Sequence, residues 1–198
     1  MSSKVSSLLV QDGRVPARRM ADAFQRQVIF GGALDTILLE MGLLEPDVLG
    51  DYLGRAYAMP FLRELPEVGP GSPAAEEVER GFTATMAERF AAVPLGREGG
   101  RLRVLVKDPP DPQDLEALAD ALSVEIEPAI TFEYRFQQAL GAVFGVLVSA
   151  RFSNLATKMD ARLKASGAPV SSPKLVTPSL FAGRKPVVPS VTAATRPA

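Results

Sequence analysis

The sequence predicts an α+β fold in which a duplicated helix-turn-helix, giving two helix pairs, precedes a small α/β lobe with a three-stranded sheet. Three observations predict it. One pattern occurs twice near the amino terminus, three short apolar runs follow it, and the last segment has no hydrophobic period. Duplicated helix pairs can bury faces that a single pair leaves exposed. We therefore expect three parts, with boundaries at residues 1–60, 61–147 and 148–198.

The repeat is visible when Lys4–Gln27 is shifted by 29 residues onto Ala33–Ala56. The shift places apolar residues on apolar residues and Gly13 on Gly42. In each copy the spacing predicts a short helix, a glycine that adopts the left-handed conformation at little cost, and a second helix with a proline in its first turn. We expect the two pairs to pack through a shared set of apolar side chains, namely Leu9, Phe24, Leu38, Leu49 and Leu53.

The second part carries the signals of a small α+β lobe. Short apolar runs predict strands at 92–95, 102–106 and 124–130. Gly99–Gly100 suits a hairpin turn between the first two strands. Helices are expected at 72–90, 113–122 and 132–144, with Ser72 and Thr131 as N-caps of the first and last.

The third part begins with a helical pattern at 153–165 and then turns to Pro, Ser and Ala without a hydrophobic period. Such a composition cannot bury enough apolar surface to offset the entropy lost on ordering. Residues 151–198 carry 8 Lys and Arg against 1 acidic residue, whereas residues 1–150 carry 14 against 22. The sequence therefore predicts a short helix followed by a basic, disordered C-terminal tail.

The composition excludes several kinds of chemistry. The chain has no cysteine and no histidine, which rules out disulfides, imidazole catalysis and Cys/His metal sites. It also lacks the G-x-x-x-x-G-K-[ST] phosphate loop that nucleotide hydrolysis would require. Asp108, Asp111 and Asp114 suit turns and helix caps better than a metal cluster. We expect no metal, no resident cofactor and no catalytic residue, so the protein is predicted not to be an enzyme.

The chain is expected to be cytoplasmic. Its start has only a three-residue apolar run, which does not suit a secretory signal, and the apolar stretch at 136–150 is too short to span a bilayer. We therefore expect no transmembrane segment. The acidic balance of residues 1–150 argues against nucleic acid as a partner.

Taken in order, these motifs resemble the MshEN domain, the N-terminal domain of type II secretion (GspE) and type IV pilus assembly ATPases. The first part is similar to the repeated pattern R-L-G-x-x-L-V-x-x-G-x-I-x-x-x-x-L-x-x-A-L-x-x-Q, with Val28–Gly32 as the spacer. The second part is similar to the module that follows it, through Ala87, Arg89, Pro94-Leu95, Leu102–Val106, Asp108-Pro109, Asp111 and Phe144-Gly145. The likeness covers about residues 4–146 and implies a stand-alone protein without the ATPase domain.

In some members of this family the repeats are a cyclic di-GMP receptor. The resemblance implies that guanines stack on apolar patches, that Arg pairs with guanine or phosphate, and that Gly lets backbone N–H groups approach a phosphate. Carried over to this chain, the ligand-binding positions are Lys4, Val5, Leu9, Val10, Gly13, Gln27, Leu34, Leu38, Leu39 and Gly42.

The chain departs from the family pattern in both copies. Lys4 and Ser6 stand where the first copy has Arg and Gly, and Ala33, Asp35 and Ala56 replace Arg, Gly and Gln in the second. Lysine keeps the charge of arginine but loses its planar fork, and Asp35 would repel a phosphate. Two interpretations stay open. One is a regulatory or protein-interaction module with a degenerate motif, whose partner is secretion or pilus machinery or a signalling protein. The other is a functional cyclic di-GMP receptor.

Overall fold

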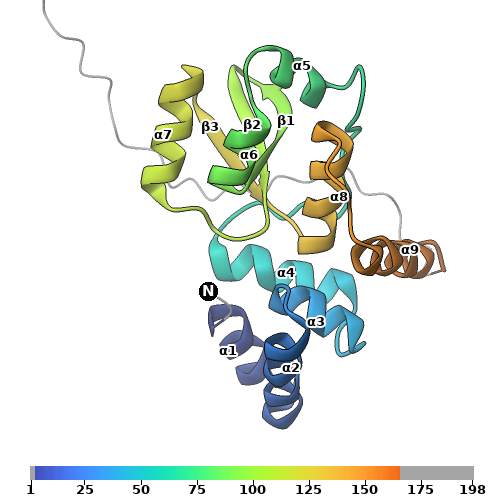
Figure 1. The fold of residues 1–198 in the computed structure, drawn as a ribbon. Coiled ribbons are helices and arrows are strands. Elements are labelled where there is room, and N and C mark those ends of the chain that lie inside the picture. Colours follow the sequence, from blue (N-terminus) through green and yellow to red (C-terminus); the bar gives the residue numbers. More distant parts are fainter. Residues whose placement is uncertain (1–2, 166–198) are drawn as a thin grey trace, which may run out of the picture.

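The computed structural model describes residues 3–165, and the arrangement of its helices and strands is drawn in Figure 1. Within this range the chain forms a helical unit at one end and an α+β lobe at the other. The expected α+β class is therefore confirmed. The predicted disordered tail, from residue 166 onward, lies outside the described residues.

The helical unit contains the two predicted helix pairs, which are α1 (Ser3–Gln11), α2 (Ala17–Phe30), α3 (Leu34–Glu40) and α4 (Pro46–Tyr57). The copies exchange partners, because α1 packs on α4 and α2 packs on α3. Gly13 and Gly42 have φ angles of 66° and 62°, so the chain leaves the first helix of each copy in the same left-handed conformation.

The core of the helical unit consists of apolar side chains from both copies. Leu9, Leu38 and Leu49 are completely buried, as predicted. The prediction for Phe24 is wrong, because 37% of its surface is exposed, whereas only 6% is exposed for Leu53 at the equivalent position of copy two. The difference arises because α4 lies against the α+β lobe while α2 lies at the far end of the molecule (Figure 1).

The lobe contains the predicted three-stranded sheet, formed by β1 (Ala92–Glu98), β2 (Arg101–Val106) and β3 (Ile126–Ile130) in that order. β1 and β2 are antiparallel, whereas β2 and β3 are parallel and are joined through α7 (Pro112–Leu122). Because they are parallel, β2 and β3 end at the same edge of the sheet. Lys107 and Asp108 follow β2 there, and the next helix, α8 (Glu133–Phe144), follows β3.

Two details of the predicted helices are corrected. The single helix expected at 72–90 is two helices, α5 (Pro73–Glu79) and α6 (Ala84–Phe90), because the chain turns at Gly81 with a φ of 114° and Thr83 then caps α6. Thr131 does not cap α8, since its hydroxyl donates to the carbonyl of Leu62 at 2.7 Å. The first turn of α8 is instead capped from the helical unit, as described below.

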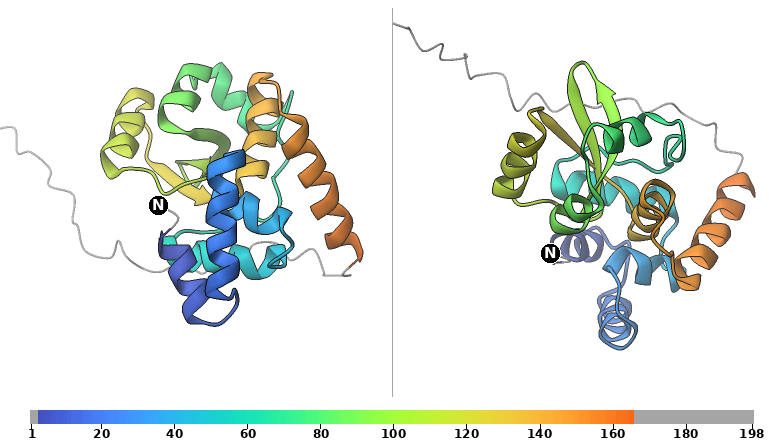
Figure 2. Two further views of the ribbon diagram at one scale, coloured as in Figure 1. Left: turned by 60° about the horizontal axis from the view of Figure 1, so that its bottom comes forward. Right: turned by 45° about the horizontal axis from the view of Figure 1, so that its top comes forward.

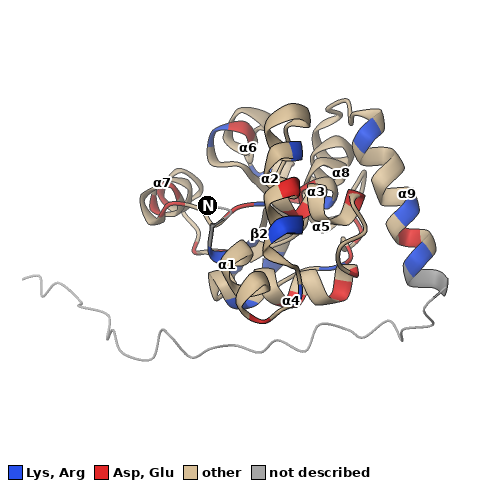
Figure 3. Ribbon diagram, turned by 90° about the horizontal axis from the view of Figure 1, so that it is seen from below, with Lys and Arg blue, Asp and Glu red and all other residues tan. Residues whose placement is uncertain are grey.

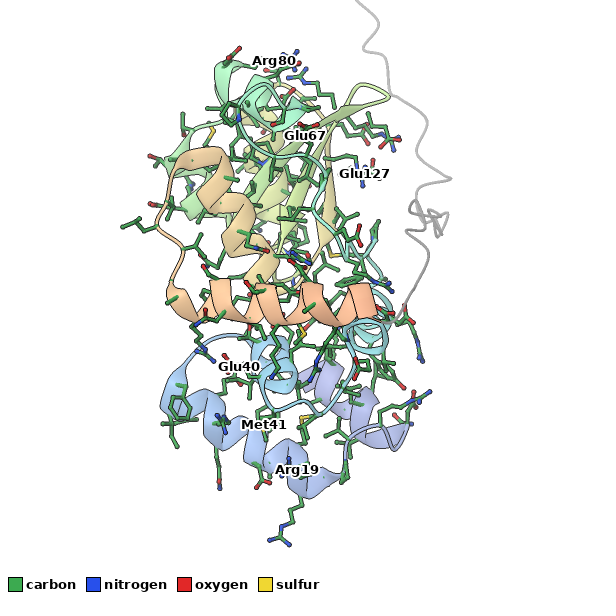
Figure 4. All side chains as sticks on the ribbon, turned by 90° about the vertical axis from the view of Figure 1, so that its right-hand side faces the viewer. Arg19, Glu40, Met41, Glu67, Arg80 and Glu127 are labelled. Atoms are coloured by element: carbon green, nitrogen blue, oxygen red, sulfur yellow. The ribbon has the colours of Figure 1, made fainter. Side chains whose placement is uncertain are left out.

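The last described helix, α9 (Ala150–Ala165), begins earlier than the predicted 153–165 and packs on both parts of the molecule. Leu155, Ala156 and Met159 are buried in the core of the helical unit. Arg135 of α8 forms an ion pair with Asp160. Figures 2 and 4 show α9 lying beside α8, and in Figure 4 it runs between the lobe and the helical unit. No helix between residues 3 and 165 is long and apolar enough to cross a membrane.

Candidate ligand-binding site

Two cavities flank the helical unit. The first has a volume of about 370 Å³ and combines the start of α3 with the end of α2, α4 and the sheet edge. We call it the copy-two cavity, and its lining residues include Gln27, Ala33, Asp35, Lys107, Asp108 and Glu133. The second, the copy-one cavity, has a volume of about 390 Å³ and is lined by Lys4, Ser7, Leu8, Arg55 and Ala56. Gln27 and Ala56 are equivalent positions, so each cavity joins the start of one copy to the end of the other.

The structure brings some of the expected ligand-binding residues together and separates others. Val5, Gln27 and Leu34 line the copy-two cavity, and Lys4 lines the copy-one cavity. The remaining positions line neither cavity. They are the fully buried Leu9, Leu38 and Leu39, the half-buried Val10, and the exposed helix-end glycines Gly13 and Gly42.

The carboxylate of Glu133 occupies the start of α3. Its Oε2 atom accepts a hydrogen bond from the backbone N–H of Ala33 at 2.6 Å and another from the hydroxyl of Thr36 at 2.8 Å. The Nζ atom of Lys107 lies 3.6 Å from the other carboxylate oxygen. A side chain of the lobe therefore satisfies donors at the start of a helix of the repeat.

The carboxylate of Asp35 makes the reciprocal contact. Its Oδ2 atom accepts a hydrogen bond from the backbone N–H of Glu133 at 2.8 Å, at the start of α8. Burial raises the pKa of Asp35 to about 7, and the negative charges of Glu133 and Asp108 add to the rise, whereas hydrogen bonds from the backbone oppose it. This Asp35–Glu133 pair joins the first turns of α3 and α8.

The two cavities differ in charge. Asp35, Asp108 and Glu133 line the copy-two cavity against the single cation Lys107. Lys4 and Arg55 line the copy-one cavity, and its lining residues include no acidic side chain, although Arg55 lies 3.8 Å from the carboxylate of Asp12. A ligand with two-fold symmetry would therefore meet opposite charges in two otherwise equivalent places.

Arg151 fixes the spacer between the copies. Its Nη1 atom donates to the carbonyls of Phe30 and Gly31 at 2.9 and 3.1 Å, while Nε and Nη2 donate to the carboxylate of Glu40 at 2.6 and 2.9 Å. Gly32, which follows Gly31 in the spacer, has a φ of 91°, and the first carbon of a side chain there would lie 3.1 Å from Oε2 of Glu133. The rim of the copy-two cavity is therefore tightly packed.

Sequence reasoning identified Asp35 as a departure from the family pattern but missed Lys107, Glu133 and Arg151. These three residues all come after residue 100, whereas the spacer and α3 end by residue 40, so no local spacing connects them to the repeat. The acidic residue in the first turn of α8 was a visible signal, since carboxylates favour helix starts, but its partner was not. Between residues 3 and 165, no group of three or more acidic side chains is arranged to hold a metal ion.

The fold and the site define an α+β domain with one cavity for each copy of a duplicated helical unit. The MshEN domain model matches residues 47–150, and the chain belongs to the MshEN domain family. The membership of the MshEN domain family expected from the sequence is therefore confirmed.

The chain is also similar to individual proteins. The type IV pilus assembly ATPase PilB of Myxococcus xanthus strain DK1622 is 25% identical over 142 residues, which are 71% of this chain and 24% of PilB. The chain therefore spans about a quarter of that relative. Among solved structures, MshE with cdg is 24% identical with a TM-score of 0.49, covering 71% of this chain and 98% of its own. The N-terminal domain of XpsE is 17% identical with a TM-score of 0.48, covering 72% and 95%.

Proposed function

We propose that the chain is a non-enzymatic regulatory or protein-interaction module whose cyclic di-GMP motif does not form a working site. The observation that carries the proposal is the Glu133 carboxylate at the start of α3, where it accepts hydrogen bonds from Ala33 and Thr36. In the family pattern this is the region at which a backbone N–H would meet a phosphate. Here an internal anion uses those donors.

A phosphate that entered the copy-two cavity would have to displace Glu133 and would still lie near Asp35 and Asp108. Hydrogen bonds to charged groups contribute about 1.5–3 kcal/mol each. If the donors of Ala33 and Thr36 stay bound to Glu133, the phosphate loses two such hydrogen bonds, which lowers its affinity by about two decades or more. The missing arginine at Ala33 and the missing glutamine at Ala56 act in the same direction.

The partner we propose is a protein of a secretion or pilus machine, or a signalling protein. The support for it is the relationship to the N-terminal domains of such ATPases, together with the absence of a phosphate loop from the sequence. As a check on the non-enzymatic part, the purified chain should release no phosphate from ATP above the background of a protein-free control.

Isothermal titration calorimetry with cyclic di-GMP tests the proposal directly. We expect no binding, or a Kd weaker than about 10 μM. Restoring the pattern by Ala33→Arg, Asp35→Gly and Ala56→Gln leaves the Glu133 carboxylate in place, so adding Glu133→Gln should give a further gain in affinity. Glu127→Gln on β3 is the matched control, because Glu127 lines neither cavity and lies in the lobe (Figure 4).

The second candidate is a cyclic di-GMP receptor. It is supported by the two cavities at equivalent positions, because Gln27 lines one and Lys4 lines the other, and both are positions that the family pattern implies for ligand binding. Sub-micromolar binding to the unmodified chain that is lost in Lys4→Ala or Gln27→Ala would select this candidate and reject the first.

A further inference from the structure

An apolar stripe runs along the exposed side of α2. Its members are spaced by four, three and four residues, so they lie on one face of the helix. All four are exposed, including Phe24 at 37% and Val28 at 86%. We call this set the α2 stripe, and it consists of Ala17, Ala21, Phe24 and Val28.

The duplication supplies a matched surface in the same molecule. The shift of 29 residues maps the α2 stripe onto Pro46, Gly50, Leu53 and Tyr57 of α4. In copy two, Pro46, Gly50 and Leu53 are buried and Tyr57 is half-buried. On both helices the stripe lies beside the residues that face the repeat core, and Leu53 itself belongs to that core, but only the stripe on α4 is covered.

The cover on α4 is the extended segment that leads into the lobe. A side chain at Gly50 would lie 2.2 Å from the ring of Phe61, and one at Gly54 would lie 3.3 Å from the carbonyl of Met59. The ring of Phe61 also packs against Phe132, with 4.9 Å between centroids. This surface of the repeated unit therefore accepts a short extended segment with an aromatic side chain.

A charged residue at the edge of each stripe indicates the charge of the segment that each surface would bind. In copy two, Asp47 forms an ion pair at 2.8 Å with Arg63, which lies two residues beyond Phe61 in the covering segment. The equivalent position in copy one is Arg18, which has the opposite charge and forms no ion pair among the described residues. Figure 3 shows the charged positions of α2.

We propose that the α2 stripe docks a short segment of a partner protein that presents an apolar side chain and, about two residues further on, an acidic side chain. The apolar side chain packs over Ala21 and against Phe24, and the acidic one pairs with Arg18. Copy one has Ala21 at the position where copy two has Gly50. The apolar side chain of the partner therefore lies less deeply against α2 than Phe61 lies against α4. This inference rests on the proposed protein-interaction role and names the surface and chemistry of the partner.

Charge selects this occupant over two others. A second copy of the chain would place the same surface on both sides of a two-fold contact and bring two copies of Arg18 together. Residues 166–198 of this chain contain Lys and Arg but no Asp or Glu, so they offer no acidic side chain within an extended segment to Arg18.

A random peptide display library, panned against the immobilised full chain, tests the proposal. Peptides with an apolar residue followed at two positions by Asp or Glu should be enriched. The binding of an enriched synthetic peptide should fall at least about tenfold when Phe24 and Val28 are both changed to Ser, which is the effect of losing a side chain central to an interface. Arg18→Glu should instead enrich peptides with Lys or Arg at the acidic position.

Arg26→Glu is the matched control, because it reverses a charge on the opposite side of the same helix and should leave the selected peptides unchanged. The proposal is overturned by the absence of any enrichment, or by enriched peptides that bind the Ser variant equally well. Two other results would show that the α2 stripe binds something other than a partner segment. One is a dimer in analytical ultracentrifugation that Phe24→Ser dissociates. The other is binding to phosphatidylglycerol vesicles that Arg18→Glu abolishes.

The same proteins separate this inference from the proposed function. Neither Arg18 nor Phe24 lines either cavity, so cyclic di-GMP calorimetry on these variants should match the unmodified chain. Tight binding of cyclic di-GMP would reject the proposed function without involving the α2 stripe. A failed peptide selection would reject the α2 stripe and leave the calorimetric result standing.

Discussion

Replacing Asp35 by Asn should change how the stability of the protein depends on pH. Asp35 is buried, accepts a hydrogen bond from the backbone of Glu133, and lies near the negative charges of Glu133 and Asp108. Burial is the main reason that its pKa rises from 3.8 to about 7. Asparagine keeps an acceptor oxygen for the N–H of Glu133 and cannot ionise, so the substitution removes the charge and preserves the contact.

The sign follows from the protons bound in each state. Between the unfolded pKa of 3.8 and the folded pKa of about 7, the folded chain holds a proton on Asp35 that the unfolded chain has released. Stability from this group is therefore fully present below the lower value and is lost as the pH rises through the upper one. Each pKa unit corresponds to about 1.4 kcal/mol, which sets the total loss at no more than about 4 kcal/mol.

Urea unfolding at several pH values from about 5 to about 8 measures the effect. Subtracting the wild-type free energy of unfolding from that of Asp35→Asn cancels the groups that titrate equally in both proteins. The difference should grow in favour of Asn by about 1–4 kcal/mol over this range. Asp51→Asn, at an exposed position on α4, is the control, and its free energy of unfolding should change with pH in the same way as that of the wild type. Parallel curves for wild type and Asp35→Asn would refute the reasoning, because Asp35 would then titrate alike in both states.

Two further substitutions test the packing by urea or thermal unfolding. Leu38→Ala removes a fully buried side chain and should cost about 2–4 kcal/mol, so a loss under about 1 kcal/mol would place Leu38 outside the shared core. Gly50→Ala should cost about 1–3 kcal/mol because the new methyl group meets the Phe61 ring, whereas the reverse change at the equivalent position, Ala21→Gly, should cost only about 1 kcal/mol from helix propensity. Equal effects at the two positions would mean that the lobe does not pack on α4 as described.

The sequence predicted the elements whose signals are local. The turn glycines Gly13 and Gly42 mark the same reversal in each copy, and both have the expected left-handed conformation. Gly99–Gly100 separates two apolar runs, and β1 and β2 pair across it. Periods of two and of about 3.6 residues are set within a few neighbours, so each run could be assigned without knowing what it packs against.

The features that the sequence could not predict depend on contacts between distant segments. Phe24 and Leu53 occupy the same position of the same pattern, and periodicity cannot distinguish them. Leu53 is 6% exposed on a helix that lies against the lobe, whereas Phe24 is 37% exposed on a helix at the far end of the molecule. The Asp35–Glu133 pair likewise joins residues 98 positions apart, through hydrogen bonds that no local spacing specifies.

Both unpredicted features have one origin, which is that the chain uses the two copies differently. In copy two, Glu133 occupies the start of α3 and Phe61 covers α4, so surfaces available for binding are engaged by the chain itself. The equivalent surfaces of copy one are the basic cavity at Lys4 and the exposed stripe containing Phe24. Substitutions that break these copy-two contacts, such as Glu133→Gln or Gly50→Ala, should therefore lower stability. Substitutions of the exposed residues Lys4 and Phe24 in copy one should leave the fold intact and change only what the protein binds.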